Sequence, residues 1–426
     1  MRFIHTADLH IGNSLHDIDR TDEFRSFFTW FKGLIIAQKA EALIIAGDVF
    51  DTVNPSNEAR KIFYEFLASL LTTDCKNIII VGGNHDSGLM LDTHSELLKA
   101  LNIQIVGSLT NHSIDDIVFE LKNTDGEPFA ICAAVPFVRE PELREYAESS
   151  DEKFATVSNK ALYDKVCQKA LQLRGQRKLP IIGTGHLYAA NLEGRLNDSN
   201  QTMENLKGHG IRDIVGNLGN VSPEAFPPEF DYIALGHIHY TTKVNKNPRI
   251  RYSGSPFVLG FDEADMPHHI LVVDLETDKE PDVKKIEVPQ TIHFKRIQGN
   301  LNEITETLAN LSLSGFETPL YLEICYKREI GIDIHQRIIE IAKDEKYEIV
   351  SWKETIDAIR TDLTWEEQGI DEVKQLSDEE VFKRLILSKT GLSEDDNQAQ
   401  ALFEEYLPLF QEIVDSIEDE KVEDLL

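Results

Sequence analysis

Five short blocks of metal-binding residue types lie in the first 240 residues of this 426-residue chain. They supply carboxylate, amide and imidazole groups, all of which bind divalent cations. Seven such ligands suit two metal ions if one carboxylate bridges them, so the pattern predicts a centre for two divalent cations. The seven are Asp8, His10, Asp48, Asn84, His186, His237 and His239.

The last four blocks each follow a run of apolar, often β-branched residues. These runs are residues 42–45, 78–81, 180–182 and 232–235. Such runs are typical of buried strands. The ligands would then follow strand C-termini, where open α/β folds place their sites.

Each block has a simpler explanation when it is taken alone. An isolated Asp-x-His is usually a surface loop, and Gly-Asp after a strand is a common turn. The Gly-His-x-His block could be a pair of core histidines or a loop. Five such blocks in order, each at a strand end, favour a metal centre over five separate coincidences.

The donor atoms also indicate which metals fit. Hard oxygen and borderline nitrogen ligands without a thiolate suit manganese, iron or zinc better than calcium. The cysteines are too far apart for a zinc knuckle and fit a reducing cytoplasm, although counting them leaves a disulfide open. They are Cys75, Cys132, Cys167 and Cys325.

The chain resembles the calcineurin-like metallophosphoesterase superfamily, and within it the SbcD family, the nuclease subunits of bacterial SbcCD complexes. The resemblance covers essentially the whole chain and is strongest over residues 1–275. The segments that carry it are Met1 to His10, Ala46 to Thr52, Gly83 to Ser87, Asp231 to His239 and Arg251 to Pro256.

The resemblance implies an α/β fold with three parts. A four-layer α/β/β/α metallophosphoesterase sandwich would form the nuclease domain, residues 1–275. A small α/β capping domain would span residues 285–360 and shape which DNA reaches the site. A helical tail over residues 370–426 would bind SbcC.

The same resemblance assigns the ligands to two cations, for which manganese is the expected metal. One would be held by Asp8, His10, Asp48 and His239, and the other by Asp48, Asn84, His186 and His237, with Asp48 as the bridge. Cations about 3.5 to 4 Å apart can generate a hydroxide and stabilise an in-line displacement at phosphorus. The implied reaction is phosphodiester hydrolysis without a covalent enzyme intermediate.

Two residues beside the ligands are the expected catalytic residues. In the family the position of His85 faces the substrate and assists the leaving oxygen, and Asp86 could orient this imidazole and raise its pKa. A loop role for His85 and a turn role for Asp86 are the alternatives.

Some relatives carry a histidine where this chain has residues 51–52. Val53 and residues 87–89 replace the arginines of protein serine/threonine phosphatases, which argues against that class.

The net charge of −31 is unusual for a DNA-binding protein, because affinity for DNA depends on Lys and Arg contacts to phosphates. The excess is uneven: residues 361–426 hold 20 acidic and 5 basic side chains. Residues 240–261 carry four basic and no acidic residues, and residues 160–178 are also basic. These two stretches are candidates for the DNA-facing surface, and a solvated helix face would explain the second equally well.

The elements around these blocks follow from periodicity. Apolar residues with helical spacing predict core helices near residues 24–35 and 62–70. Beyond residue 275, a β-α-β-α-β order is predicted over residues 292–297, 301–311, 320–325, 334–342 and 347–352.

The tail predicts two helices from about Asp371, with Pro408 kinking the second. An apolar stripe on the second helix requires a partner surface. In the family this partner is the coiled-coil base of the SbcC-like ATPase, and folding back onto the chain itself is the alternative. The stripe comprises Phe403, Tyr406, Leu407, Phe410, Ile413, Val414 and Ile417.

The resulting interpretation is a manganese-dependent double-strand exonuclease that also opens hairpins as an endonuclease, in DNA repair, recombination and replication. The family pairs two nuclease with two ATPase chains, and the absence of a phosphate-binding Gly-Lys-Ser/Thr loop assigns ATP to that partner. With no apolar run of 18 residues and no signal region, we expect a soluble, cytoplasmic protein. A small-molecule or cyclic-nucleotide phosphodiesterase and a metal-binding scaffold without catalysis are the alternatives.

Overall fold

The computed structural model describes residues 1–110, 112–146, 154–189, 221–311, 319–327, 334–341 and 347–355, and seven separate positions of the tail. Contacts between residues divide the chain into two compact units, Met1–Lys353 and Glu354–Leu426. The described residues of the first unit contain three sheets and the helices that cover them. Among the described residues, no helix is long and apolar enough to cross a membrane.

The first sheet has six strands in the order β12-β11-β1-β2-β3-β4. Strands β1 to β4 run parallel, β11 pairs with β1 in antiparallel orientation, and β12 pairs with β11 in antiparallel orientation at the edge. The C-terminal ends of β1, β2 and β3 therefore meet at one edge of the sheet. The strands are β1 (Arg2–Thr6), β2 (Ala42–Ala46), β3 (Asn77–Val81), β4 (Ile103–Val106), β11 (His269–Asp274) and β12 (Asp282–Glu287).

The second sheet also has six strands, in the order β5-β6-β7-β8-β10-β9. Strands β6, β7, β8 and β10 are parallel, and an antiparallel strand closes each edge. Its strands are β5 (Val118–Lys122), β6 (Pro128–Ala133), β7 (Ile181–His186), β8 (Tyr232–Gly236), β9 (Thr242–Lys243) and β10 (Ile250–Tyr252).

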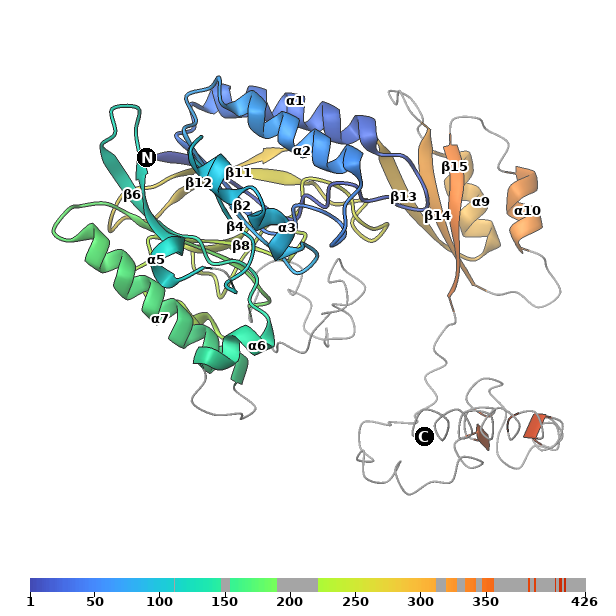
Figure 1. Cartoon of the computed structure of the whole chain (residues 1–426). Coiled ribbons are helices and arrows are strands. Elements are labelled where there is room, and N and C mark those ends of the chain that lie inside the picture. Colours follow the sequence, from blue (N-terminus) through green and yellow to red (C-terminus); the bar gives the residue numbers. More distant parts are fainter. Residues whose placement is uncertain are drawn as a thin grey trace. The chain divides into compact units, whose positions relative to one another are not determined.

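The two sheets pack face to face, and helices cover both outer faces (Figure 1). Side chains alternate along each strand: Ile44 of β2 contacts the second sheet, whereas Leu43 and Ile45 contact the helices α1 (Thr21–Gln38) and α2 (Asn57–Leu70). Helix α7 (Phe154–Arg174) covers the second sheet. This arrangement confirms the expected α/β sandwich.

Short helices occupy the connections between these layers. They are α3 (Gly88–Asp92), α4 (Ser95–Lys99), α5 (Ile114–Ile117), α6 (Glu140–Leu143) and the 3-10 helices η1 (Arg144–Tyr146) and η3 (Pro223–Ala225). The predicted core helices correspond to α1 and α2, whose phenylalanines are buried. All four cysteines are buried and unpaired, so they form no disulfide.

The third sheet has the order β13-β14-β15 and confirms the predicted β-α-β-α-β sequence of elements. Its elements are β13 (His293–Gly299), α9 (Leu301–Ala309), β14 (Leu320–Lys327), α10 (Ile334–Ile341) and β15 (Tyr347–Thr355). The two helices pack on one face of this sheet around Ile304 and Ile338. We refer to residues 293–355 as the cap and to residues 1–288 as the lobe.

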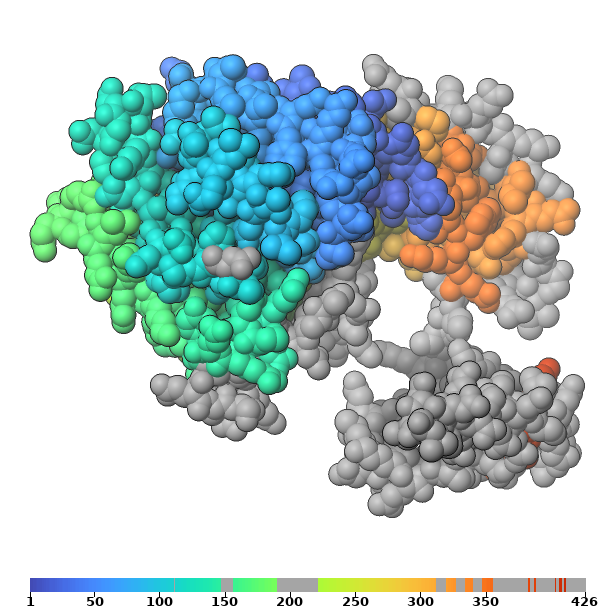
Figure 2. Space-filling model, in the orientation of Figure 1, coloured from blue at the N-terminus to red at the C-terminus, as the bar shows by residue number. Residues whose placement is uncertain are grey.

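The other face of the cap sheet contacts the lobe. Phe294 and Tyr321 of the cap pack in one apolar cluster with Ile18, Val258 and Phe261 of the lobe. In Figure 2 the cap, in orange, borders the N-terminal segment of the lobe, in dark blue. The cap and the lobe therefore share a packed apolar interface.

Most of the predicted helical tail lies outside the described residues. At the described positions, Phe382 stacks on Phe410 with ring centroids 4.2 Å apart and lies 5.8 Å from Phe403. Phe403 and Phe410 belong to the predicted apolar stripe. Part of this stripe is thus covered by another aromatic residue of the same unit, while Tyr406 remains 48% exposed.

Candidate metal centre

All five predicted ligand blocks lie at strand ends. The blocks after β1, β2 and β3 leave the same edge of the first sheet, and β7 and β8 are neighbouring parallel strands of the second sheet. His186 is the last residue of β7 and pairs with Gly236 of β8. This topology brings side chains more than 200 residues apart in sequence into one cluster.

Asp48 lies at the centre of the cluster. Its Oδ2 atom is 3.4 Å from His10 Nε2 and 3.2 Å from His186 Nε2. Its other oxygen, Oδ1, accepts the backbone N–H of His85 at 2.8 Å. One carboxylate oxygen thus faces ligands that the resemblance assigns to two different cations, which fits a bridging position.

Asn84 connects the remaining ligands on one side. Its Oδ1 atom is 3.0 Å from His186 Nε2 and 3.0 Å from His237 Nδ1. On the other side, one potential ligand atom from each of Asp8, His10 and His239 lies within 4.8 Å of the others. The structure therefore gathers all seven predicted ligands into one cluster.

The donor set fits divalent cations by two criteria. His10 Nε2 is buried and has no hydrogen-bond partner, so its lone pair is available to a cation. Burial, followed by the charge of His186, lowers the pKa of His237 to about 3, which keeps this imidazole neutral. Burial opposes ionisation of Asp48, but His186 and His10 hold its pKa well below the usual range.

The backbone of the ligand loops is unusual. Asp8, His10, Asp48 and His237 all have positive φ angles, of 54°, 42°, 48° and 101°. Non-glycine residues seldom adopt this region, and such residues concentrate at functional sites. The hydrogen bonds from the His237 N–H to both Asp8 oxygens, at 2.9 and 3.1 Å, help to hold the two loops in place.

Two glycines let the ligand loops approach each other. Gly47 has φ +93°, and a β-carbon there would overlap the His186 ring. A β-carbon on Gly83 would overlap the carboxylate and backbone nitrogen of Asp48. The sequence of these blocks thus requires glycine for steric as well as conformational reasons.

Sequence reasoning missed two carboxylates that orient ligand histidines. Asp51 Oδ1 is 3.1 Å from His10 Nδ1, and Glu263 Oε1 is 2.8 Å from His239 Nδ1. Such contacts fix the tautomer that presents Nε2 to a metal. Asp51, three residues after a ligand, offered a weak signal, whereas Glu263 lies 24 residues after His239 and offered none.

His85 is partly buried beside the ligands. Its ring lies edge-on to His10, with centroids 4.8 Å apart, and its Nδ1 is 3.0 Å from the backbone carbonyl of Asp51. If Nδ1 carries the hydrogen, that contact leaves Nε2 as the ring atom free to exchange a proton with a substrate. Asp51 therefore positions His10 through its side chain and His85 through its backbone.

The expected interaction between Asp86 and the His85 ring was wrong. Asp86 is buried, and its carboxylate accepts the backbone N–H groups of Val49, Phe50 and Gly83 at 2.9 to 3.0 Å. A carboxylate committed to three amides ties two ligand loops together. Its role is therefore to support the loops rather than to orient His85.

The two basic stretches have different surroundings from those expected. On α7 and just beyond it, Lys160, Lys169 and Arg177 form ion pairs with Asp164, Asp115 and Glu120. The turn between β9 and β10 lies beside the N-terminal end of β8, because β10 runs parallel to β8. The ligands follow the C-terminal end of β8, so this turn points away from them.

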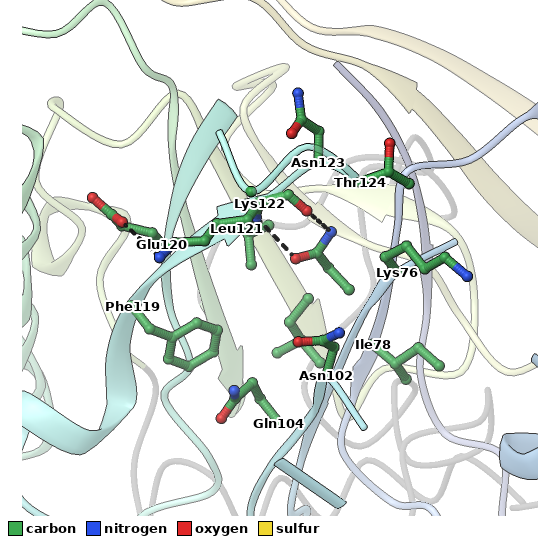
Figure 3. Close-up of a pocket in the computed structure, with 13 residues that line it drawn as sticks. Lys76, Ile78, Asn102, Gln104, Phe119, Glu120, Leu121, Lys122, Asn123 and Thr124 are labelled. Atoms are coloured by element: carbon green, nitrogen blue, oxygen red, sulfur yellow. Dashed lines mark hydrogen bonds and ion pairs between the residues drawn. The ribbon is translucent and has the colours of Figure 1, made fainter. Parts of the chain in front are cut away.

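A cavity of about 540 Å³ lies apart from the ligands (Figure 3). It opens between β3 and β5, and Asn77, Asn102 and Lys122 are among its lining residues. Asn77 is the first residue of β3, whereas Asn84 and His85 follow the last, so the cavity faces the opposite end of the strand.

Comparison with known proteins gives the family context. Residues 1–241 match the family described as calcineurin-like phosphoesterase, and residues 291–390 match a domain described as type 5 capsule protein repressor C-terminal domain. The SbcD subunit of the nuclease SbcCD from Escherichia coli K12 is 30% identical over 94% of this chain and 96% of its own length. The proteins of the same name from Rhodobacter capsulatus and Bacillus subtilis are 32% and 27% identical over 74% and 99% of this chain, and 76% and 99% of their own lengths.

Proposed function

The chain belongs to the SbcD family of calcineurin-like phosphoesterases, and we propose that it is the nuclease subunit of an SbcCD-type complex. It would hydrolyse phosphodiesters at duplex DNA ends and open hairpins, in repair, recombination and replication. The observation that carries the proposal is the convergence of the six other predicted ligands around Asp48.

Each ligand has a defined part in the proposed mechanism. Asp8, His10 and His239 would hold one divalent cation, Asn84, His186 and His237 would hold the other, and Asp48 would contribute to both. Manganese suits this mixed oxygen and nitrogen set. Two bound cations would supply a deprotonated water and stabilise charge on the phosphoryl oxygens.

The chain's own residues then position the reaction. Asp51 and Glu263 keep the Nε2 atoms of His10 and His239 directed at the centre. His85, whose Nδ1 donates to the Asp51 carbonyl, would in its doubly protonated form give the Nε2 proton to the leaving oxygen and become neutral. Asp86 holds the loops that carry Asp48 and His85.

We also propose a division of the chain into functional parts. Residues 1–275 form the nuclease domain and residues 285–360 the capping domain, which would restrict access to the site. Residues 370–426 would bind the coiled coil of an SbcC-like ATPase, in a complex of two nuclease and two ATPase chains in the cytoplasm. Tyr406, a residue of the apolar stripe that is 48% exposed, supports a docking role for the tail.

The test is digestion of an end-labelled DNA duplex in manganese, with bis-p-nitrophenyl phosphate as a small substrate. His85→Gln should slow duplex degradation by about a hundredfold or more, as expected for loss of a general acid. His94→Gln is the matched control, because His94 is exposed and lies outside the ligand cluster.

Two outcomes would contradict the proposal. Unchanged duplex degradation by His85→Gln would remove this histidine from the chemistry. Hydrolysis of the small ester without attack on duplex, even with the ATPase partner present, would instead indicate a small-molecule phosphodiesterase.

A further inference from the structure

The segment from His10 to Arg20 contacts both the metal centre and the cap. It begins at a ligand, and its side chains Leu15 and Ile18 pack with cap residues of the apolar interface cluster. It ends at Arg20, directly before α1. A movement of the cap would therefore change the contacts of the segment that carries the ligand His10.

Arg20 is a buried cation at this interface. Its Nε donates to Glu23 at 2.5 Å, and its Nη1 donates to Asn13 at 2.9 Å and to the Val258 carbonyl at 2.8 Å. Its Cζ atom lies 5.5 Å from the ring centroid of Phe294, which belongs to the cap. Burying a cation is costly unless partners surround it, so these contacts determine where the guanidinium lies.

Asn13 connects Arg20 to the metal ligand. Its Oδ1 accepts from Arg20, and its Nδ2 donates to Asp51 Oδ1 at 3.0 Å. The same Asp51 oxygen is 3.1 Å from His10 Nδ1. Because an arginine only donates and a carboxylate only accepts, the Asn13 amide fits in one orientation, and His10 Nδ1 must be the protonated ring nitrogen.

We propose that Arg20 and Asn13 are positioning residues that couple cap docking to the His10 cation site, a proposal that rests on the proposed metal centre. With Phe294 in place, Arg20 holds Asn13, Asn13 fixes the Asp51 carboxylate, and Asp51 directs His10 Nε2 at the cation. A displaced cap loosens this series of contacts and weakens one of the two cation sites, while the site of Asn84, His186 and His237 keeps its affinity.

The experiment measures manganese binding to the metal-free full-length chain by calorimetry and by electron paramagnetic resonance. Asn13→Ala should weaken one of two manganese sites by about tenfold, the lower end of the range for residues behind a ligand. Phe294→Ala should weaken the same site by about threefold, because its effect passes through Arg20. Phe294→Leu, which keeps the apolar contact without the ring face, provides a second variant if the alanine form unfolds.

A readout of turnover separates positioning from a general structural role. Asn13→Ala should need more manganese for half-maximal hydrolysis of bis-p-nitrophenyl phosphate, while saturating manganese restores kcat and KM is unchanged. Two variants serve as controls and should bind manganese like the wild type. Lys295→Ala removes a cap–lobe ion pair with Asp265 that does not involve Arg20, and Arg25→Ala removes an exposed arginine of α1, the helix that follows Arg20.

Two results would overturn the inference. Wild-type binding by Asn13→Ala would show that His10 is positioned without this series of contacts. Weak manganese binding by Asn13→Ala together with wild-type binding by both Phe294 variants would show that the cap does not affect the His10 cation site. Manganese binding needs no DNA, so an inability of the wild type to cut DNA would count only against the proposed nuclease function.

Discussion

A buried carboxylate forms the centre of a polar cluster in two regions of the molecule, Asp48 in the lobe and Glu323 in the cap. The Glu323 carboxylate accepts hydrogen bonds from Arg296 at 2.5 Å and Ser351 at 3.2 Å, and it forms an ion pair with Lys353 at 2.9 Å. Around Asp48 the neighbours are ligands, and His10 Nε2 has no hydrogen-bond partner.

The difference distinguishes a polar cluster that stabilises a fold from one that binds a ligand. Arg296 and Lys353 carry the charge opposite to that of Glu323, and together with Ser351 they complete its hydrogen bonding. Around Asp48, lone pairs converge that only cations or protons can satisfy. Changes at the two carboxylates should therefore separate activity from stability.

The largest effect is expected for Asp48→Asn. An amide bridges cations poorly, and the loss of several kcal/mol of transition-state stabilisation corresponds to about a thousandfold or more in turnover. Duplex digestion measures this loss, and thermal unfolding without metal should show a folded chain. Retained activity with two bound manganese ions would show that Asp48 is not the bridge.

Intermediate effects are expected for Asp51→Asn and Glu263→Gln. Each removes the charge that directs a ligand histidine, and such changes typically cost about 10- to 100-fold in metal affinity. Manganese titration checks the prediction, with Asp265→Asn on an exposed carboxylate as the control. Unaltered affinity in both variants would place these two carboxylates outside the centre.

Glu323→Gln should affect stability and leave chemistry intact. We expect a loss of about 2 kcal/mol, less than for a fully buried pair, because Lys353 and Arg296 keep contact with water. Urea unfolding of the cap measures it, and hydrolysis of bis-p-nitrophenyl phosphate by the folded variant should match the wild type. Reduced turnover with unchanged stability would show that Glu323 serves activity rather than the stability of the cap.

The contribution of Glu323 should depend on pH with a definite sign. Burial alone would raise its pKa, but Lys353 and Arg296 outweigh burial and hold the pKa below the ordinary value. A lowered folded-state pKa contributes stability above the unfolded pKa of about 4.3, and this is lost as the pH falls through the folded value. The stability difference between wild type and Glu323→Gln should therefore shrink as the pH falls below about 4.

Only a small effect on chemistry is expected for Asp86→Asn, although Asp86 is adjacent to His85. The amide cannot accept from all three backbone N–H groups, which should cost about 1 to 3 kcal/mol of stability. The folded fraction should keep its turnover within about threefold, since the His85 ring has a different partner. A large loss of kcat in a stable variant would restore Asp86 as a residue that acts on His85.

Much of the site could be predicted because its ligands lie next to strands. Parallel strands bring their C-terminal ends to one edge, so apolar runs followed by ligand types indicate convergence from sequence alone. The cap elements were also predictable, because their apolar residues recur with strand or helix periodicity. Periodicity could not identify Asp51, Glu263 and Arg20. Their roles depend on which segments pack against each other, and periodicity gives no information about that.

The strand order of the first sheet has a consequence for synthesis of the chain. Strand β1 lies between β2 and β11, so the N-terminal strand gains its second neighbour only after residues 269–274 are made. The ligands themselves are complete only at residue 239. A chain that ends before residue 239 would therefore lack a ligand, and a chain that ends before β11 would leave one edge of β1 unpaired.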